Sequence, residues 1–269
     1  MPTLLAMLLI FPAIGVLSGL LAGLFGIGGG LVIVPALNLV FVAGLVAMDP
    51  EVRMHVAIGS SLAVIVFTAV SSARAHVGYG AVLWPTVRAL APGMVCGALL
   101  GAWIADALHT RALEIVFGTF VALMALQIGL APKIEGEGRG RLPGTPVNLA
   151  AGTVIGTVSA LGGIGGGLLA VPWMVWHSVP MRLAVGTAAA CTLPVALSGA
   201  TGYAIAGHAA EVPGWATGYL YWPAIGGIAL ASVLTAPLGA RLAHRLPVRQ
   251  LRRLFALLLA FVAVDMLSG

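Results

Sequence analysis

The hydrophobic and polar positions of this chain fall into ten long apolar runs, separated by short polar breaks. A helix needs about 20 mostly apolar residues to cross a bilayer, and most of the runs have that length. The runs are 3–25, 31–48, 56–73, 83–105 and 112–131, then 146–163, 167–179, 183–206, 215–243 and 247–267. The seventh run is short, so it is a candidate half-helix, and so is the second. We therefore predict an all-α polytopic membrane protein with about 8 to 10 transmembrane helices, some of them short or re-entrant.

One polar stretch interrupts this pattern near the middle of the chain. Residues 132–144 read "PKIEGEGRGRLPG", which is rich in glycine and charge and is typical of a linker. The predicted organisation is a first transmembrane repeat over 1–131, a polar linker over 132–145 and a second repeat over 146–269.

The two halves resemble each other in sequence. "LFGIGGGLVIVP" at 24–35 returns as "LGGIGGGLLAVP" at 161–172, which is 137 positions later. Further matches follow in order: "AIGS" (57–60) with "AVGT" (184–187), Ser71 with Ser198, "WP" (84–85) with "WP" (222–223), and "GAWIA" (101–105) with "GARLA" (239–243). These later offsets are 127 and then 138, so one loop differs by about ten residues between the halves. The pattern indicates an internal duplication.

The number of segments and the distribution of charge predict how the repeats are oriented. Five segments per half is an odd number, so the second copy should be inverted, as in many secondary transporters. With ten segments, 11 of the 13 Lys and Arg residues lie in odd-numbered loops, and Arg53 and Arg111 lie in even-numbered ones. The positive-inside rule then places the odd loops in the cytoplasm and both termini outside.

Composition supports a membrane location. Hydrophobic residues make up 60% of the chain and charged residues 8%, against about 25% charged in soluble domains. The start "MPTLLAMLLIFP" has no Lys or Arg, so we expect a retained first span rather than a cleaved signal peptide. We expect a multi-pass protein of the cell (inner) membrane. No basic cluster with interleaved aromatic residues suggests nucleic acid binding.

The paired glycine phrases are the strongest candidate for a binding site. Consecutive glycines weaken a helix and permit positive φ, and each phrase precedes an apolar helix that carries Pro35 or Pro172 early in its course. Such helix N-termini are electropositive and bind anions. We therefore predict a substrate site that includes Gly28, Gly29, Gly30, Pro35, Gly165, Gly166, Gly167 and Pro172. The alternative is that these glycines only permit close helix packing, as we expect for Gly15, Gly19 and Gly23 and for Gly152 and Gly156.

Other intramembrane polar residues are weaker candidates. Ser60, Ser61 and Thr187 follow helix starts, and their hydroxyls either contact substrate oxygens or bond their own i−4 carbonyls. Asn38 is a candidate pore-facing amide.

Three ionisable residues are candidates for proton coupling or charge balance: Arg74, His76 and Arg88. Histidine titrates near neutrality, which suits a coupling proton. The alternative for the two arginines is that they lie at the membrane interface.

Two pairs of motifs stand in the same order in the two halves: "GLFGIGGGLVIVPAL" (23–37) with "HVAIGSSLAVIVFTAVSSARAH" (55–76), and "GGIGGGLLAVPWM" (162–174) with "RLAVGTAAACTLPVALSGATGY" (182–203). In these motifs the chain resembles the TauE/SafE family of sulfite exporters. The resemblance implies a polytopic membrane transporter for sulfur-containing anions such as sulfite or organosulfonates, commonly with about eight spans. Thr201 and Tyr203 stand where the first half has Arg74 and His76, so any role of that basic pair is single-copy.

The predicted function is therefore a secondary transporter that moves a small sulfur-containing anion, in the export direction, by alternating access around the glycine loops. An anion channel on the same scaffold is the alternative. No GxxxxGK[ST] motif indicates ATP hydrolysis, and no HExxH motif or paired intramembrane aspartates indicate an enzyme. The six histidines lie at segment ends, so we expect no metal site, haem or other cofactor.

Overall fold

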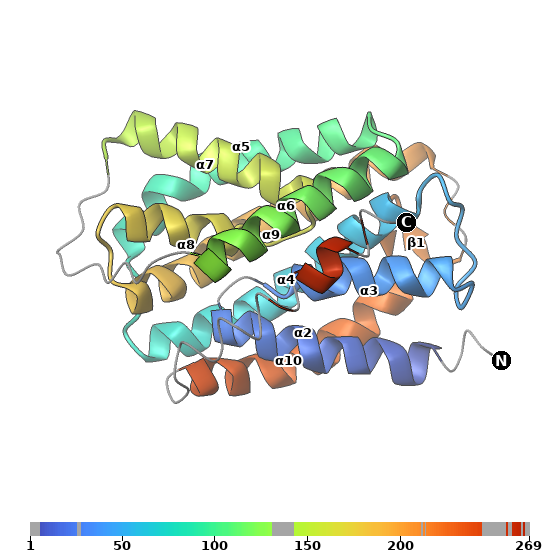
Figure 1. Ribbon diagram of the computed structural model, residues 1–269, viewed down its shortest axis with the longest axis horizontal. Helices are drawn as coiled ribbons and strands as arrows, with labels where there is room; N and C mark the ends of the chain where they lie inside the picture. The colour runs from blue at the N-terminus through green and yellow to red at the C-terminus, as the bar shows by residue number, and fades with distance from the viewer. Residues whose placement is uncertain are drawn as a thin grey trace.

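The structure is a computed structural model that describes residues 6–25, 28–130, 143–210, 212, 214–243, 257, 260–264 and 266. Its helices run close to parallel with the long axis of the molecule (Figure 1). In chain order they are a π-helical turn η1 (Ala6–Ile10), α2 (Phe11–Phe25), α3 (Gly30–Val42), α4 (Arg53–Gly78), α5 (Trp84–Asp106), α6 (Thr110–Leu130), α7 (Thr145–Leu161), α8 (Gly167–Trp176), α9 (Met181–Ala206), a 3-10 turn η2 (Gly207–Ala209), strands β1 (Ala216–Thr217) and β2 (Leu220–Tyr221), and α10 (Trp222–Ala243).

The prediction of an all-α polytopic membrane protein is confirmed. Within the described residues, four helices are long and apolar enough to cross a membrane, namely Arg53–Gly78, Trp84–Asp106, Met181–Ala209 and Trp222–Leu242. Large apolar side chains on these helices face outward, among them Trp103 at 72% exposure, Leu230 and Leu234. A surface of this kind is suited to lipid rather than to water.

Helices α3 and α8 are too short to span. At 1.5 Å per residue, their 13 and 10 residues extend about 20 and 15 Å, against about 30 Å of hydrocarbon. Both begin near the middle of the molecule, and they run toward opposite ends of it (Figure 1). The expectation that the second and seventh apolar runs form half-helices is therefore met.

Glycines bring two pairs of helices into backbone contact. A Cβ added at Gly15, Gly19 or Gly23 of α2 would collide with a carbonyl oxygen of α10, and one added at Gly93, Gly97 or Gly101 of α5 would collide with a carbonyl oxygen of α7. Gly152 and Gly156 of α7 approach α5 in the same way. Close packing through small residues is typical of membrane helices, so the packing role expected for these glycines holds.

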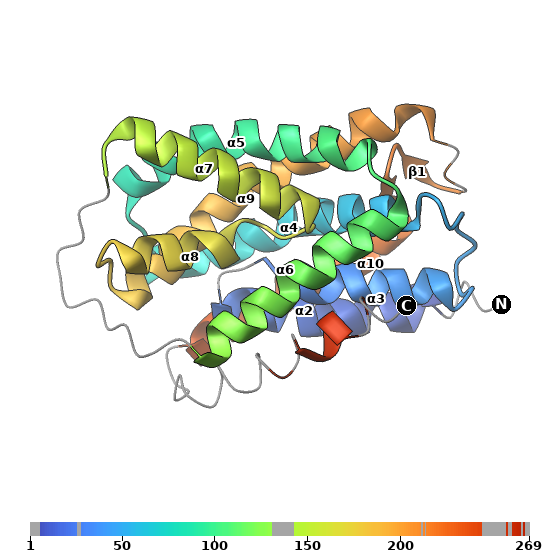
Figure 2. The same ribbon diagram turned by 45° about the horizontal axis from the view of Figure 1, so that its top comes forward.

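The two halves of the chain interlock. Helix α2 packs along α10, α7 packs along α5, and α4 packs against α9 in the centre. The sequence offsets match α2 with α7 and α10 with α5, so the α2–α10 contact corresponds to the α7–α5 contact. Helices α2 and α7 also run in opposite directions along the long axis (Figures 1 and 2). These features support the predicted inverted repeat, which remains a prediction, as do the repeat boundaries.

The ninth predicted run, 215–243, was too long. Its first residues form a two-stranded hairpin in which Ala216 pairs with Tyr221 and Thr217 with Leu220. Gly214 and Gly218 adopt positive φ of 85° and 55°. Helix α10 begins only at Trp222, and Pro223 is its second residue. Most of the tenth run, 247–267, and most of the linker lie outside the described residues.

Candidate functional site

Left-handed glycines start both half-helices. Gly29 precedes α3 with φ 83°, and Gly166 precedes α8 with φ 77°. Gly28 and Gly163 also have positive φ, of 80° and 61°. L side chains rarely adopt this backbone conformation, so the glycine phrases are required by local geometry as well as by packing.

The two glycine loops meet inside the molecule. A Cβ added at Gly30 would collide with the carbonyl oxygen of Gly163, from the other half of the chain. Gly28 and Gly165 both pack against Ile65 of α4 and Thr192 of α9. Ile65 and Thr192 occupy matching positions, 127 residues apart. The structure therefore brings the predicted residues Gly28 and Gly30 together with Gly165, whereas Gly29 packs against Ser18 and Gly166 against Val195. Gly167 follows directly as the first residue of α8.

Ser61 joins this cluster. Its hydroxyl donates a hydrogen bond of 2.9 Å to the carbonyl oxygen of Gly163, and its side chain is fully buried. Ser61 comes from α4 in the first half, whereas Gly163 belongs to the second glycine loop. The bond therefore ties the two halves together where the loops meet, and we call Gly28–Gly30, Gly163–Gly167, Ser61, Ile65 and Thr192 the loop cluster.

The electrostatics of the loop cluster favour an anion. The first N–H groups of a helix have no partner within the helix, and the helix dipole makes that end electropositive. Two helix starts lie together here, and the loop cluster includes no ionisable side chain. Its attraction for an anion would come from backbone dipoles, as at other helix N-termini that bind anions.

Pro35 and Pro172 each occupy the sixth position of a half-helix. Proline has no N–H group, so the carbonyls four residues earlier, of Leu31 and Leu168, lose their usual helical donor. Pro35 is buried and Pro172 is half-buried. Each proline therefore removes one helical hydrogen bond close to the loop cluster, and neither proline is part of that cluster.

Ser60 and Thr187 join other parts of the protein. The hydroxyl oxygen of Ser60 accepts a hydrogen bond of 2.9 Å from the N–H of Tyr221, and that of Thr187 accepts one of 2.9 Å from the N–H of Leu83. Tyr221 and Leu83 each directly precede a Trp-Pro helix start. We call these two contacts the hydroxyl latches; they attach α4 to the start of α10, and α9 to the start of α5.

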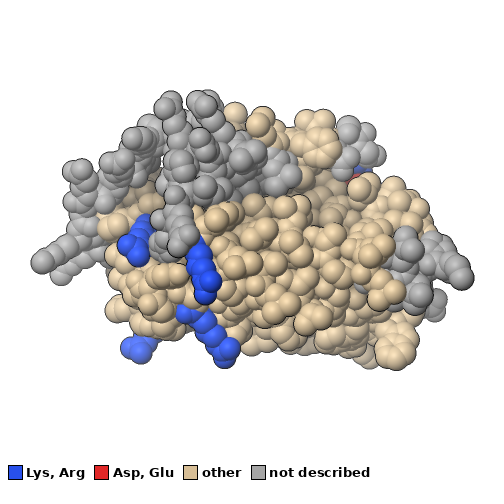
Figure 3. Space-filling model, turned by 90° about the horizontal axis from the view of Figure 1, so that it is seen from below, with Lys and Arg blue, Asp and Glu red and all other residues tan. Residues whose placement is uncertain are grey.

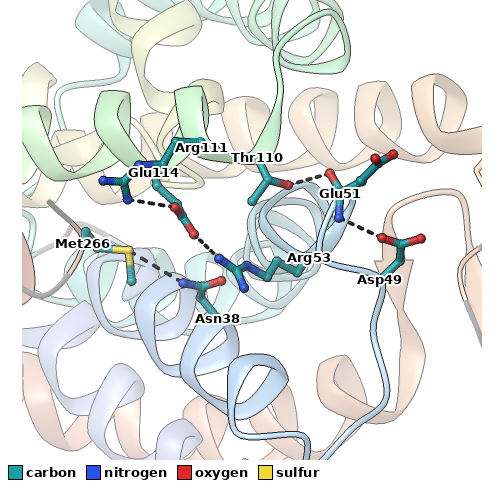
Figure 4. A network of polar contacts seen from close by, with 8 residues as sticks. All are labelled: Asn38, Asp49, Glu51, Arg53, Thr110, Arg111, Glu114 and Met266. Carbon is teal, nitrogen blue, oxygen red and sulfur yellow. Dashed lines mark hydrogen bonds and ion pairs between the residues drawn. The ribbon is translucent and has the colours of Figure 1, made fainter. Parts of the chain in front are cut away.

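Asn38 lies eight positions beyond Gly30, about 12 Å along α3, away from the loop cluster. Its amide nitrogen contacts the sulfur of Met266 at 4.0 Å, and its buried amide oxygen has no hydrogen-bond partner. Figure 4 shows it beside an ion-pair network in which Glu114 binds Arg53 at 2.8 Å and Arg111 at 3.2 Å.

The three ionisable candidates also lie apart from the loop cluster. Arg74 is about 20 Å along α4 from Ser61, and its side chain is exposed, like that of Arg88 on α5. His76 is 2% exposed, in the last turns of α4. Arg74, Arg88, Arg182 and Arg241 belong to helix ends that meet at one end of the molecule, where the basic side chains visible in Figure 3 also gather.

Sequence reasoning missed Ile65 and Thr192 as part of the cluster. The signal was present, because the offset of 127 that matches "AIGS" with "AVGT" also matches these two positions. Neither residue is chemically conspicuous, and only the structure places both against the glycine loops.

Short half-helices that begin at buried left-handed glycines, within a scaffold of spanning helices, define a class of membrane protein with discontinuous helices of the kind found in transporters. The family model described as "Sulfite exporter TauE/SafE" matches residues 11–266. The chain belongs to this family, and it is a multi-pass membrane transporter.

Relatives with similar lengths carry transporter names. The chain is 35% identical over 255 residues to a "Probable membrane transporter protein" of Haemophilus influenzae, covering 94% of this chain and 95% of the relative. It is 31% identical to "Probable membrane transporter protein YunE" of Bacillus subtilis, covering 74% and 79%, and 24% identical to "Probable membrane transporter protein MJ0441" of Methanocaldococcus jannaschii, covering 94% and 93%. No solved structure matches the chain.

Proposed function

We propose that this protein is a secondary transporter that exports a small sulfur-containing anion, of the sulfite or organosulfonate class, across the cell membrane. The observation that carries the proposal is the meeting of the two half-helix starts, with Gly30 against the carbonyl oxygen of Gly163. The substrate class rests on the membership of the chain in a family of sulfite exporters.

Alternating access around the glycine loops is the proposed mechanism. Half-helix α3 packs on α4 and α8 packs on α9, so each loop moves with a different long helix. Rocking α4 against α9 would separate Gly30 from Gly163 and expose helix N-termini to an anion. The close packing at the loop cluster favours a carrier over an open channel, because Gly30 and the Gly163 carbonyl oxygen would have to separate before an anion could pass between them.

The proposed orientation follows the charges. The end of the molecule that carries Arg74, Arg88, Arg182 and Arg241 faces the cytoplasm, as the positive-inside rule favours. At the other end, Arg53 and Arg111 both pair with Glu114. Both termini are then extracytoplasmic, and the membrane is the cell (inner) membrane. The exposed arginines favour this orientation by their charge. His76, buried at the end that would face the cytoplasm, is the proposed proton-coupling residue.

Transport by purified protein in liposomes tests the proposal. The panel is sulfite, sulfate, thiosulfate, taurine, sulfoacetate and acetate, each measured as saturable uptake and as counterflow. We expect saturable uptake and counterflow for at least one sulfur oxyanion. Uptake that does not saturate and shows no counterflow would favour the channel, and transport of acetate alone would overturn the substrate class.

A matched pair of variants tests the place of the site. Ser61→Ala and Ser71→Ala each remove a hydroxyl of α4 that donates a 2.9 Å hydrogen bond to a carbonyl oxygen of the other half, Gly163 for Ser61 and Val233 for Ser71. Only Ser61 touches a glycine loop. We expect Ser61→Ala to raise KM by roughly two- to tenfold, the value of one hydrogen bond, and Ser71→Ala to leave KM unchanged. Equal KM changes in both variants would remove the loop cluster from the transport site.

A further inference from the structure

A groove of about 850 Å³ opens between α4 and α10, at the end of the molecule that carries the exposed arginines. Its apolar wall includes Val66, Phe67 and Val70 from α4 and Val233 and Pro237 from α10. Arg74 and Arg241 are its basic residues. Both arginines have exposed side chains, one from each helix.

The charge of this groove has no acidic counterpart among its lining residues. The four described carboxylates belong to segments at the other end of the molecule. Asp49 and Glu51 precede α4, Asp106 ends α5, and Glu114 lies near the start of α6. The Ser71 hydroxyl, also in the groove, already donates to the Val233 carbonyl oxygen at 2.9 Å. Within the part of the chain that the structure describes, two guanidinium groups therefore lie at the mouth of an apolar wall with no carboxylate beside them.

The groove faces the hydrocarbon side of the protein. Phe67 in its wall is 48% exposed, and the neighbouring α10 residues Leu234 and Leu238 are 68% and 50% exposed. A ligand that fits must combine an anionic head, at the level of the arginines, with an apolar part along the wall. Basic sites between membrane helices on the cytoplasmic side bind lipid head groups of this kind.

We propose that the groove between α4 and α10 binds an anionic phospholipid, with its phosphate between Arg74 and Arg241 and an acyl chain along Val66, Phe67 and Val70. Arginine suits this role because its planar guanidinium binds phosphate oxygens in a bidentate manner. A free anion would use the two arginines but would leave the exposed apolar wall without a partner. The proposal is independent of which substrate the protein transports.

The matching pair of helices, α9 and α5, lacks this chemistry. The positions that match Arg74 and Arg241 hold Thr201 and Trp103, by the offsets of 127 and 138. Thr201 is exposed and bonds its own i−4 carbonyl, of Leu197, while Trp103 is 72% exposed. An exposed tryptophan suits an interface without a specific head group. The arginine pair is thus confined to one groove and one end of the molecule.

Lipid retention by the purified full-length protein tests the proposal. The protein is reconstituted with equal amounts of phosphatidylglycerol and phosphatidylcholine, extracted, and its bound lipids are counted by native mass spectrometry. The test variant is Arg74→Gln with Arg241→Gln. The matched control is Arg88→Gln with Arg182→Gln, which removes two exposed arginines from the same end but none from the groove.

We expect the wild type and the control to retain phosphatidylglycerol in preference to phosphatidylcholine. In the test variant, the ratio of bound phosphatidylglycerol to phosphatidylcholine should fall about fivefold for each arginine removed. An equal loss in the control would mean that the lipid follows the overall charge of this end and would overturn the proposal. Displacement of the lipid by millimolar inorganic phosphate would also overturn it, because the groove would then bind a free anion. The thermal midpoint of each variant shows that it is folded.

Discussion

The middle of the molecule and its two ends differ in how closely the halves match. In the middle, Gly29 and Gly166 start their half-helices with nearly equal φ. Ile65 and Thr192 contact the same two glycines. These parts are duplicated in geometry as well as in sequence.

The two ends of the molecule differ from each other in residues and in local structure. One end carries Arg74 and Arg241, whereas the matching positions at the other end hold Thr201 and Trp103. The second half has the hairpin 216–221 where the first half has only a short turn before Trp84. In the proposed carrier, the middle of the molecule would open to both sides in turn, whereas each end would face a single aqueous phase. We infer that the duplicated parts serve the transport cycle and that the divergent parts serve orientation and the surroundings of each end.

The largest expected effect comes from the glycine contacts shared by both halves. Gly23→Val would drive a side chain into the Ala236 carbonyl of α10, and Gly97→Val would do the same at Thr153 of α7. Overpacking against backbone is difficult to relieve, so we expect each variant to lose about 3 kcal/mol of unfolding free energy. Unfolding of the purified protein in detergent, followed by circular dichroism, measures this loss.

Gly226→Ala is the control for both valine variants, because an added Cβ at Gly226 of α10 meets open space. It should leave stability unchanged or slightly raised. A large loss for Gly23→Val with none for Gly97→Val would show that the two helix pairs are not equivalent.

The parts that sequence predicted correctly are those with strong periodic or repeated signals. Apolar runs of spanning length gave the long helices, and three adjacent glycines in a repeated phrase located the loops. Hydrogen-bond partners of small hydroxyls were not predictable: Ser61 bonds Gly163 while its neighbour Ser60 accepts from Tyr221. Successive helical residues point about 100° apart, so adjacent serines reach different elements, and their partners depend on tertiary packing. The hairpin was missed because its Leu-Tyr strand continues the apolar pattern of α10.

The ion-pair network at one end gives the next effect. Glu114 is 5% exposed and is shared by Arg53 and Arg111. Glu114→Ala removes the buried carboxylate that both arginines share, but both arginines are partly exposed, so we expect a loss of about 1–2 kcal/mol. Thermal unfolding checks this value. The double variant Arg53→Ala with Glu114→Ala should be less damaging than the two single changes added together, and strict additivity would contradict a coupled network.

The hydroxyl latches allow a direct comparison of the two halves. Ser60→Ala and Thr187→Val each leave one backbone N–H without its acceptor, at a cost of about 1–2 kcal/mol. The Ser60 latch should cost more, because Tyr221 is buried whereas Leu83 is half-buried and can reach water. Equal losses, measured by chemical denaturation, would indicate that the two latches are equivalent in energy as well as in length.

The smallest effect concerns the hairpin, which belongs to the second half alone. Burial, together with a 2.9 Å hydrogen bond to the Asp106 carboxylate, raises the pKa of Tyr219 to about 12. Because the folded-state pKa lies above the ordinary value of about 10, the neutral phenol stabilises the fold fully below pH 10, and this contribution is lost as the pH rises from 10 to 12. Tyr219→Phe should therefore flatten the decline of stability across that window.

Part of this decline should survive in Tyr219→Phe, because burial also raises the pKa of Tyr221 in the same hairpin. The measurement is the thermal midpoint of wild type and Tyr219→Phe from pH 8 to pH 12. Identical pH profiles would mean that the Tyr219 phenol does not stabilise the hairpin through Asp106. A flatter profile for the variant would show that the Tyr219 phenol stabilises the hairpin. The short turn before Trp84 in the first half has no corresponding contact, so the two halves would differ in stability at this end of the molecule.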